Sequence, residues 1–282
     1  MTAAVQTRRI ALEYPSLEHL PRHFVSGDPV MSHVVAMLSA MFPDGEDFFV
    51  RSVRTFRDEL TDPVLGEQVK GFIGQEAMHG REHRAFNEHL AALGYPTQGV
   101  ERFVDWALRL RERIWSRRAN LAVTAALEHY TATLAETLLA DAAARDLFDV
   151  DEVRSLLLWH ALEESEHKAV AFDVYRAVGG TERLRRLMMN LTTFAFLVML
   201  VTTTTVSILQ DPTVRRHPRG LARSLARLRR SPFLTRDVFV RVRAYNRPGF
   251  HPDDNDATEL VARWRDELFG PDGTLATRIK VG

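Results

Sequence analysis

Along most of the chain, hydrophobic residues recur every three or four positions, which is the spacing of one helix face. This pattern predicts four long helices, over residues 44–60, 64–93, 100–144 and 151–178. A shorter apolar helix over 29–40 is expected to stop at Pro43 and Gly45, because proline interrupts helical hydrogen bonding. Strand-like alternation is rare, so the sequence predicts an all-α fold in which the long helices form a bundle.

The character of the sequence changes after Gly180. Residues 187–209 contain no charged side chain, and arginines lie on both sides of them. At about 1.5 Å per residue such a helix is roughly 34 Å long, which is enough to cross a bilayer. Asn190 and seven Ser/Thr residues dilute its apolar character. The helix could therefore span a membrane, lie on its surface, or pack on the bundle and wall an apolar substrate channel.

Three regions follow from this pattern. Residues 1–28 are expected to form an irregular N-terminal arm, and residues 29–180 the four-helix bundle. Residues 181–282 should form the apolar helix and a basic C-terminal helical region that packs on the bundle. This last region includes basic stretches over 219–230 and 236–247 and a final helix over 257–269.

Charge is balanced overall but unevenly distributed. The chain has 37 Lys and Arg against 37 Asp and Glu, so no net field favours nucleic acid as a partner. From Thr181 to Phe250, however, 14 Arg stand against three acidic residues, which leaves +11 on that stretch. A basic region beside an apolar run favours contact with an anionic membrane surface, although an ordinary solvated face is the simpler interpretation.

The chain contains no cysteine, which excludes disulfides, thiolate nucleophiles, zinc fingers and Fe–S clusters together. Histidine, aspartate and glutamate remain as metal ligands. The first thirty residues lack the apolar segment of a signal peptide. We therefore expect a cytoplasmic protein, either free or associated with the inner face of the membrane.

Two of the predicted helices carry a glutamate followed three positions later by a histidine. The pairs are Glu76–His79 and Glu164–His167. Residues three apart project from one helix face about a turn apart, so both side chains of a pair can reach one ion. Each pair shares its face with hydrophobic residues, and a buried carboxylate is costly unless it is paired, protonated or bound to a metal.

The other two long helices each place one glutamate on an apolar face. Glu46 lies beside the hydrophobic positions of 49–56, and Glu128 shares its face with Leu121 and Leu138. The single glutamate precedes its pair by 76 − 46 = 30 residues in the first half and by 164 − 128 = 36 in the second. Two such hairpins would bring together the ligands of a ferritin-like di-iron or di-manganese bundle. The alternative is a set of ordinary, satisfied polar residues.

Two histidines and a threonine lie near these ligands. His160 lies four residues before the second Glu-x-x-His pair, and His83 lies one turn after the first. Each could be a further metal ligand, or could orient a metal ligand through a hydrogen bond. Thr131, one turn after Glu128, is the candidate for a residue that lines the site where oxygen chemistry takes place.

Several segments resemble a known bacterial family described as predicted metal-dependent hydrolases, and the resemblance covers most of the chain after residue 30. The segments are Phe42–Arg54, Val69–His83, Leu127–Ala132, His160–Tyr175 and Tyr245–Pro252. The His-x-x-x-Glu-x-x-His helix of 160–167 is also similar to that of ferritin-like N-oxygenases of aryl amines. This second resemblance covers the motif only, and it implies a di-iron centre that activates O₂.

We therefore expect a non-haem di-iron oxidoreductase of the oxygenase, hydroxylase or desaturase type, with an apolar or amphipathic organic substrate. It would hold two Fe ions, or Mn in their place, and would use O₂ and an external electron donor. The alternative is a two-metal hydrolase of an ester or amide. Iron storage is a third interpretation, disfavoured by the long basic C-terminal region. The expected partner is a lipophilic small molecule and not a nucleic acid, while a homodimer and a membrane-surface contact both stay open.

Overall fold

The computed structural model describes residues 5–10, 12 and 20–279. Within these residues the chain forms helices and connecting segments, and its only β pairing is an isolated bridge between Ile10 and Ile279. The all-α prediction is therefore confirmed.

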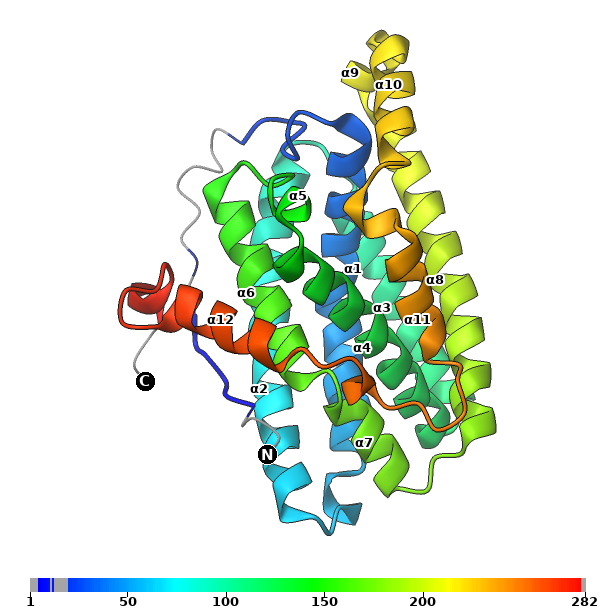
Figure 1. Cartoon of the computed structure of the whole chain (residues 1–282). Coiled ribbons are helices and arrows are strands. Elements are labelled where there is room, and N and C mark those ends of the chain that lie inside the picture. The colour runs from blue at the N-terminus through cyan, green and yellow to red at the C-terminus, as the bar shows by residue number, and fades with distance from the viewer. Residues whose placement is uncertain (1–4, 11, 13–19, 280–282) are drawn as a thin grey trace.

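Four long helices enclose the interior: α1 (Pro29–Arg54), α2 (Pro63–Ala92), α4 (Arg117–Ala140) and α6 (Asp151–His167). Both α1 and α6 contact α2 and α4, so these helices close a ring around one core (Figure 1). These are also the helices that carry the glutamates and histidines singled out in the sequence.

The remaining helices cover this ring. α3 (Thr97–Ile114) packs on α1, α7 (Val170–Ala177) follows α6, and α8 (Glu182–Gln210) packs on α4 and α1. α11 (Arg236–Ala244) lies along α4, and α12 (Thr258–Phe269) crosses α6 (Figure 1). The short elements are η2 (Arg57–Glu59), α5 (Ala142–Arg145), α9 (Pro212–Arg216), α10 (Pro218–Leu228), η3 (Pro232–Leu234), η4 (Pro252–Asp254) and η5 (Ala276–Arg278).

Side-chain caps set the starts of the long helices. Asp28 accepts a hydrogen bond from the Met31 N–H at the start of α1, and Asp62 does the same for Val64 at the start of α2. Each cap is followed by a proline, whose missing N–H costs nothing in the first helical turn.

Pro43 lies inside α1, so the helix end expected there is wrong. Proline has no N–H to donate to the carbonyl four residues earlier, which is that of Ser39. The side-chain amide of Asn87 on α2 donates to this carbonyl at 3.0 Å, and Arg84 donates to the carbonyl of Pro43 itself at 3.4 Å. The neighbouring helix therefore satisfies the backbone that proline leaves unpaired, and α1 continues through the centre of the bundle.

Two other long predicted helices are divided in the structure. The helix expected over 100–144 is interrupted at Trp115, whose backbone is extended, and Ser116 caps the start of α4 by accepting from the Ala119 N–H at 3.2 Å. The helix expected over 151–178 ends at His167 and resumes as α7. The sequence signal for the break between α3 and α4 is Ser116, because serine favours the N-cap position of a helix.

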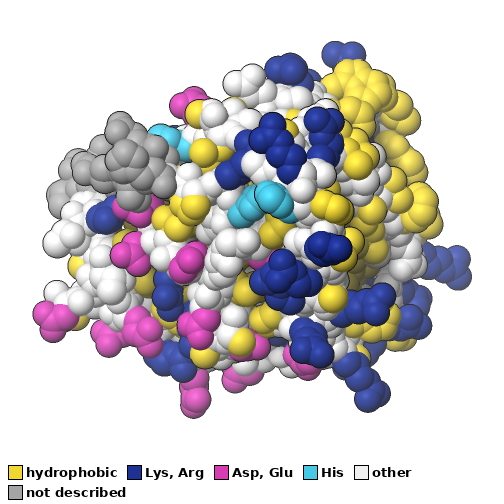
Figure 2. Space-filling view, turned by 90° about the horizontal axis from the view of Figure 1, so that it is seen from above, with side chains coloured by type: hydrophobic (Ala, Val, Ile, Leu, Met, Phe, Trp, Pro, Cys, Tyr) yellow, Lys and Arg dark blue, Asp and Glu magenta, His cyan; other side chains and the backbone are white. Residues whose placement is uncertain are grey.

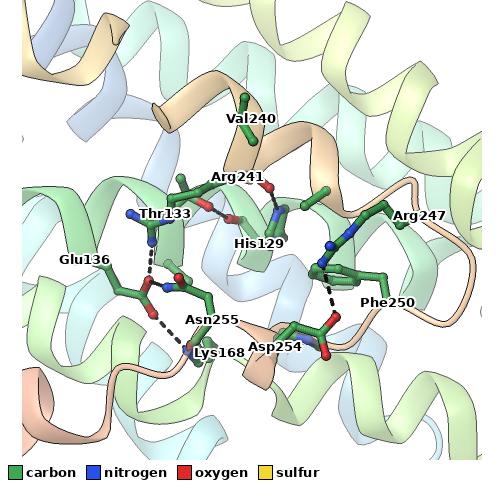
Figure 3. A pocket seen from close by; sticks show the side chains of 13 residues that line it. His129, Thr133, Glu136, Lys168, Val240, Arg241, Arg247, Phe250, Asp254 and Asn255 are labelled. Atoms are coloured by element: carbon green, nitrogen blue, oxygen red, sulfur yellow. Dashed lines mark hydrogen bonds and ion pairs between the residues drawn. The ribbon is translucent and has the colours of Figure 1, made fainter. Parts of the chain in front are cut away.

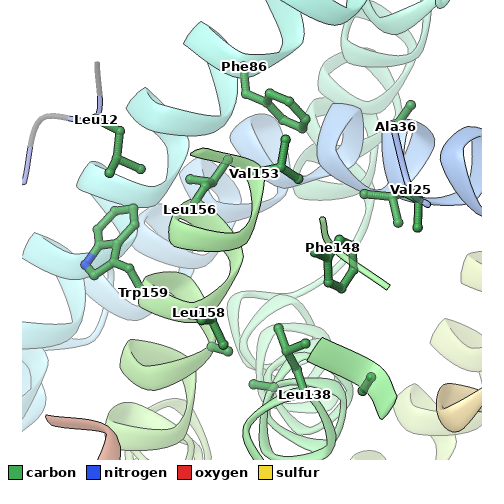
Figure 4. Packing of buried hydrophobic residues seen from close by; sticks show 14 of the residues in the cluster. Leu12, Val25, Ala36, Phe86, Leu138, Phe148, Val153, Leu156, Leu158 and Trp159 are labelled. Carbon is green, nitrogen blue, oxygen red and sulfur yellow. The ribbon is translucent and has the colours of Figure 1, made fainter. Parts of the chain in front are cut away.

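Two hydrophobic clusters fill the interior, one at each end of the bundle. The first gathers around Trp159 and Phe86 (Figure 4), and the second around Phe48 and Phe72. Along α1, α2 and the α6–α7 segment, the polar residues of interest lie between the positions that belong to the two clusters. A polar layer therefore crosses the middle of an otherwise apolar core.

Candidate metal centre

Seven of the eight side chains predicted as possible metal ligands on α1, α2, α4 and α6 converge in this polar layer, and His83 is the exception. Their ligand atoms form overlapping groups whose members all lie within 4.8 Å of one another. The groups are Glu46, His79 and His160; Glu76, Glu128 and His167; and Glu76, His79 and Glu164, which joins the first two. None of these residues is more than 5% exposed.

The distances between facing nitrogen and oxygen atoms are close to the distances between two ligand atoms that bind the same metal ion. His167 Nε2 lies 3.0 Å from Glu76 Oε1 and 3.3 Å from Glu128 Oε2. His160 Nε2 lies 3.7 Å from Glu46 Oε1. Two ligands that are each about 2.1 Å from one ion lie roughly 3.0–3.4 Å apart in octahedral or tetrahedral geometry. The group around His167 therefore has the size needed to surround one ion, and the group around Glu46 is slightly wider.

Many of these atoms have no hydrogen-bond partner among the described residues. This holds for both carboxylate oxygens of Glu46, Glu76 and Glu128, and for His79 Nδ1 and His167 Nε2. An unsatisfied buried polar atom costs about 1–3 kcal/mol, and a charged one costs more. Cations placed among these atoms would satisfy them together. When ionised, the four carboxylates of the cluster carry four negative charges, which two divalent ions balance.

Two of the imidazoles are held from outside the cluster by acceptors. His79 Nε2 lies 3.1 Å from Glu163 Oε2, and His167 Nδ1 lies 2.8 Å from Gln75 Oε1. Carboxylate and amide oxygens accept hydrogen bonds, so the outward nitrogens carry protons. The inward nitrogens are then available to a metal, which is the usual arrangement behind histidine ligands.

His160 is held through a chain of hydrogen bonds that sets its tautomer. Ser39 Oγ donates to Asn87 Oδ1 at 2.6 Å, so it accepts from His83 Nδ1, 2.9 Å away. His83 Nε2 then has no proton and accepts from His160 Nδ1 at 2.7 Å. His160 Nε2 is therefore the nitrogen open to a metal, and it faces the cluster, 3.0 Å from Glu164 Oε1 and 3.7 Å from Glu46 Oε1. Both nitrogens of His83 are used, so the structure does not bring His83 among the converging atoms.

A buried ion-pair network lies behind His79. Arg8 Nη1 is 2.9 Å from Glu163 Oε1, and Arg8 Nη2 is 2.7 Å from Glu166 Oε1. Arg265 on α12 lies 2.8 Å from the same Glu166 oxygen. The N-terminal arm, for which the sequence predicts no role in the site, thus contacts the carboxylate that orients a candidate ligand.

Burial and crowding change the proton affinities of the cluster. Burial and neighbouring carboxylates raise the pKa of Glu46 well above its usual range, and they raise that of Glu128 to about 8. Burial acts in the same direction on Glu164, but the adjacent histidines outweigh it and hold its pKa well below the usual range. Burial lowers the pKa of His79, yet its carboxylate neighbours prevail and raise it to about 10. In the absence of cations, the cluster therefore balances its charge by retaining protons.

The two halves of the cluster differ at one position. Four residues before the glutamate of each pair, α6 carries His160 whereas α2 carries Phe72. The His160 ring stacks on His79 with 4.2 Å between ring centroids, and the Phe72 ring meets His167 edge-on at 4.9 Å. The half around Glu46 consequently contains two imidazoles, and the half around Glu128 contains one.

Other residues lie differently from what their sequence positions suggest. Thr131 is half-buried, and its hydroxyl donates to the carbonyl of Glu128 at 3.1 Å, so the structure does not bring it among the converging atoms. Gln75 and Arg8 are supporting residues that the helical pattern does not distinguish. The one sequence signal for Gln75 is that it directly precedes a ligand position, and the structure buries it completely.

A pocket of about 150 Å³ opens beside α4, lined by residues outside the central cluster. Glu136 lies in it and is bound by Lys168 Nζ at 2.9 Å, by Arg241 and by Asn255 (Figure 3). Lys168 directly follows His167, so the pocket adjoins a ligand-bearing segment. Its buried carboxylate is already neutralised by these partners.

A further group, His23, His33 and Asp211, also meets the spacing of a metal site. Here the polar atoms have partners. Arg22 Nε lies 2.8 Å from Asp211 Oδ2, and His33 contacts Ser207 at 2.7 Å. Burial lowers the pKa of His33 to about 4, which keeps it neutral. Because no buried side-chain nitrogen or oxygen of this group lacks a partner within the described residues, it differs from the central cluster.

Comparison with known proteins gives one finding. No curated protein and no solved structure matches the chain. Residues 6–256 match the family described as "Predicted metal-dependent hydrolase", and this range includes α1, α2, α4, α6 and every residue of the central cluster. The match covers far more than half of the sequence. The chain therefore belongs to the family of predicted metal-dependent hydrolases.

Proposed function

We propose that this protein is a metalloenzyme with a dinuclear centre in the middle of the bundle. The observation that supports it most directly is the set of fully buried carboxylate oxygens and imidazole nitrogens that converge without hydrogen-bond partners. Mixed carboxylate and imidazole ligands suit iron and manganese, and we infer iron first. The proposed ligands are Glu46, Glu76, His79, Glu128, His160, Glu164 and His167.

The two ends of the cluster define the proposed roles. Glu46, His79 and His160 would hold one ion, and Glu128 and His167 the other, according to the groups that their atoms form. Glu76 and Glu164 lie in the group that joins both ends and would contact both ions. The outward hydrogen bonds of the imidazoles keep their inward nitrogens in place before any ion arrives.

Metal-dependent hydrolysis is the reaction class that the family description supports. A pair of divalent ions supplies Lewis-acid activation for such a reaction. The protein contributes rigid ligands and apolar surroundings that keep bulk water away from the centre. These surroundings favour an ester or amide with apolar substituents over a sugar or a nucleotide.

Oxidation of an apolar substrate with O₂ is the second candidate. It is favoured by the complete burial of the four carboxylates between two hydrophobic clusters, since such a site shields reactive oxygen chemistry from water. The Glu-x-x-His pairs on two helices, each accompanied by a single glutamate from another helix, are the ligand pattern of oxygen-activating bundles.

Metal analysis of matched variants tests the dinuclear centre. Glu128→Gln should lower the metal content of purified protein from about two ions per chain to about one, because it removes a ligand of one group. Glu136→Gln changes another buried glutamate of α4 and should leave the metal content unchanged. Equal metal content in the wild type and Glu128→Gln would contradict the proposal.

The reaction class is tested with the wild-type protein in two forms. Protein loaded with zinc or manganese under anaerobic conditions is assayed on p-nitrophenyl esters and anilides of increasing chain length. Protein loaded with iron is mixed with a reductant and O₂, and oxygen consumption is followed with and without apolar amines, alkanes and fatty acids. Anaerobic turnover supports hydrolysis, whereas substrate-dependent O₂ consumption by the iron form alone supports oxidation.

A further inference from the structure

The outer side of α8 presents an unusual surface. α8 is the one helix within the described residues that is long and apolar enough to cross a membrane. It nevertheless packs along one side on α4 and α1, as Figure 1 shows at the edge of the bundle. Its other side is open, and large hydrophobic residues there are 43–71% exposed. These residues, named here the α8 outer face, are Leu187, Leu191, Phe194, Leu197, Val198, Val201, Val206 and Leu209.

α8 is apolar on both sides, unlike an ordinary surface helix. Its buried positions are Arg185, Met188, Met189, Thr192, Thr204 and Ser207, and its outer face carries leucine, valine and phenylalanine where a water-facing side would be polar. In a surface helix surrounded by water, the apolar stripe points toward the core. A helix that turns its largest apolar side chains outward is suited to an apolar environment on that side.

α3 also carries exposed apolar side chains. α3 and α8 meet where Arg111 Nη2 contacts Met188 Sδ at 3.3 Å. Phe103 and Trp106 of α3 are 51% and 58% exposed, and their rings lie 5.7 Å apart. Exposed aromatic residues beside an apolar helix are typical of proteins that contact the headgroup region of a membrane.

Arginines lie at both ends of the α8 outer face. Arg183 precedes it, and Arg215, Arg216 and Arg219 follow it in α9 and α10. These four are exposed, and none forms an ion pair with any described residue. Figure 2 shows hydrophobic side chains gathered on one side of the molecule, with Lys and Arg side chains beside them and most visible acidic side chains elsewhere.

We propose that the α8 outer face lies in the interfacial region of an anionic lipid membrane, with α8 parallel to the membrane plane. The inner side of α8 stays on the bundle, which is why the helix rests on the membrane and does not cross it. The arginines at its two ends contact anionic headgroups, while the side chains between them enter the apolar boundary. A second copy of the chain fits less well, because in a symmetric pair each arginine-flanked face would meet another of the same charge.

Vesicle flotation of the full-length protein tests this proposal. We expect the protein to float with vesicles of phosphatidylcholine and phosphatidylglycerol, and much less with phosphatidylcholine alone. High salt should weaken binding, because it screens the arginines. The double variant Phe194→Asp/Val201→Asp should reduce bound protein about tenfold, since it places charge in the apolar layer. Val64→Asp on α2 is the matched control, because Val64 is 59% exposed and lies outside the α8 outer face.

Circular dichroism and thermal unfolding confirm that each variant is folded. The proposal is overturned if the wild type does not float with anionic vesicles. It is also overturned if the double variant floats to the same extent as the wild type. Light scattering tests the alternative, in which a second copy of the chain covers the α8 outer face. A wild-type dimer that the double variant converts to a monomer, without vesicle binding by either, would show that the face joins two copies. Membrane binding is independent of the metal centre, so these outcomes do not depend on the proposed function.

Discussion

His83 Nε2 lies 2.7 Å from His160 Nδ1, on the side of His160 that faces away from the carboxylate cluster. This contact fixes which nitrogen of His160 can bind a metal. It also separates two roles that the sequence left open for both histidines, since one imidazole faces the cluster and the other supports it from behind.

Removing this support should weaken metal binding without abolishing it. In His83→Leu, His160 loses the acceptor that holds its tautomer and ring orientation. Losses of this kind lower metal affinity by about 10–100-fold. Competition with a chelating dye measures the affinity of each ion, and one ion should be affected much more than the other. His217→Leu changes an exposed histidine and should leave both affinities at the wild-type value. Equal weakening of both ions in His83→Leu would contradict the assignment.

Metal loading should release protons. Glu46 and Glu128 have raised pKa values, the latter about 8, and His79 has a pKa raised to about 10. These groups hold protons at neutral pH in the metal-free protein, and a bound ion must displace them. Apparent affinity should therefore rise as pH increases from about 6 to about 8, with roughly two or more protons released per chain at neutral pH. Calorimetry in buffers of different ionisation enthalpy counts the protons, and the absence of any release would refute this.

Arg8 should stabilise the fold strongly although it lies in the N-terminal arm. Arg8→Leu leaves Glu163 and Glu166 buried without this cation, and removing one partner of a buried pair costs about 3–5 kcal/mol. Arg9→Leu changes the exposed neighbour and should alter the free energy of unfolding by less than about 0.5 kcal/mol. Denaturant unfolding compares the two variants. Equally small changes in the free energy of unfolding of both variants would show that the arm does not support the site.

Two glycines of α2 give a second measure of how tightly the arm packs. A Cβ at Gly71 would lie 2.1 Å from the Val5 carbonyl oxygen, whereas a Cβ at Gly66 would meet nothing within 4 Å. Gly66→Ala should stabilise the protein by about 0.5–1 kcal/mol through its helix propensity. Gly71→Ala should instead destabilise it by about 1–3 kcal/mol, because the backbone of the arm must move. Thermal unfolding of both variants measures the difference, and stabilisation by both would mean that the arm is displaced at little cost.

The features that depend on local spacing could be predicted from the sequence. Helical periodicity places Glu46, Glu76, Glu128 and Glu164 on core-facing sides because face and spacing are properties of a single helix. The continuation of α1 through Pro43 could not be predicted in this way. It depends on Asn87, a residue of another helix that reaches the unpaired carbonyl of Ser39.

The supporting residues of the cluster were less predictable for the same reason. Arg8 contacts Glu163 across 155 residues of sequence, and no local pattern relates the two. Gln75 is an amide next to a ligand position, and its role emerges only when His167 is placed opposite it. Periodicity identifies which side chains enter the core, whereas their partners depend on how the helices are arranged.

The position of Glu166 between two distant arginines has a consequence for the order in which the protein is completed during translation. Arg8 precedes Glu166 by 158 residues, and Arg265 follows it by 99. Every proposed ligand has therefore been synthesised well before the second arginine leaves the ribosome. A nascent chain that captured metal at that stage would do so while Glu166, which shares Arg8 with the carboxylate behind His79, still lacked one of its two cations.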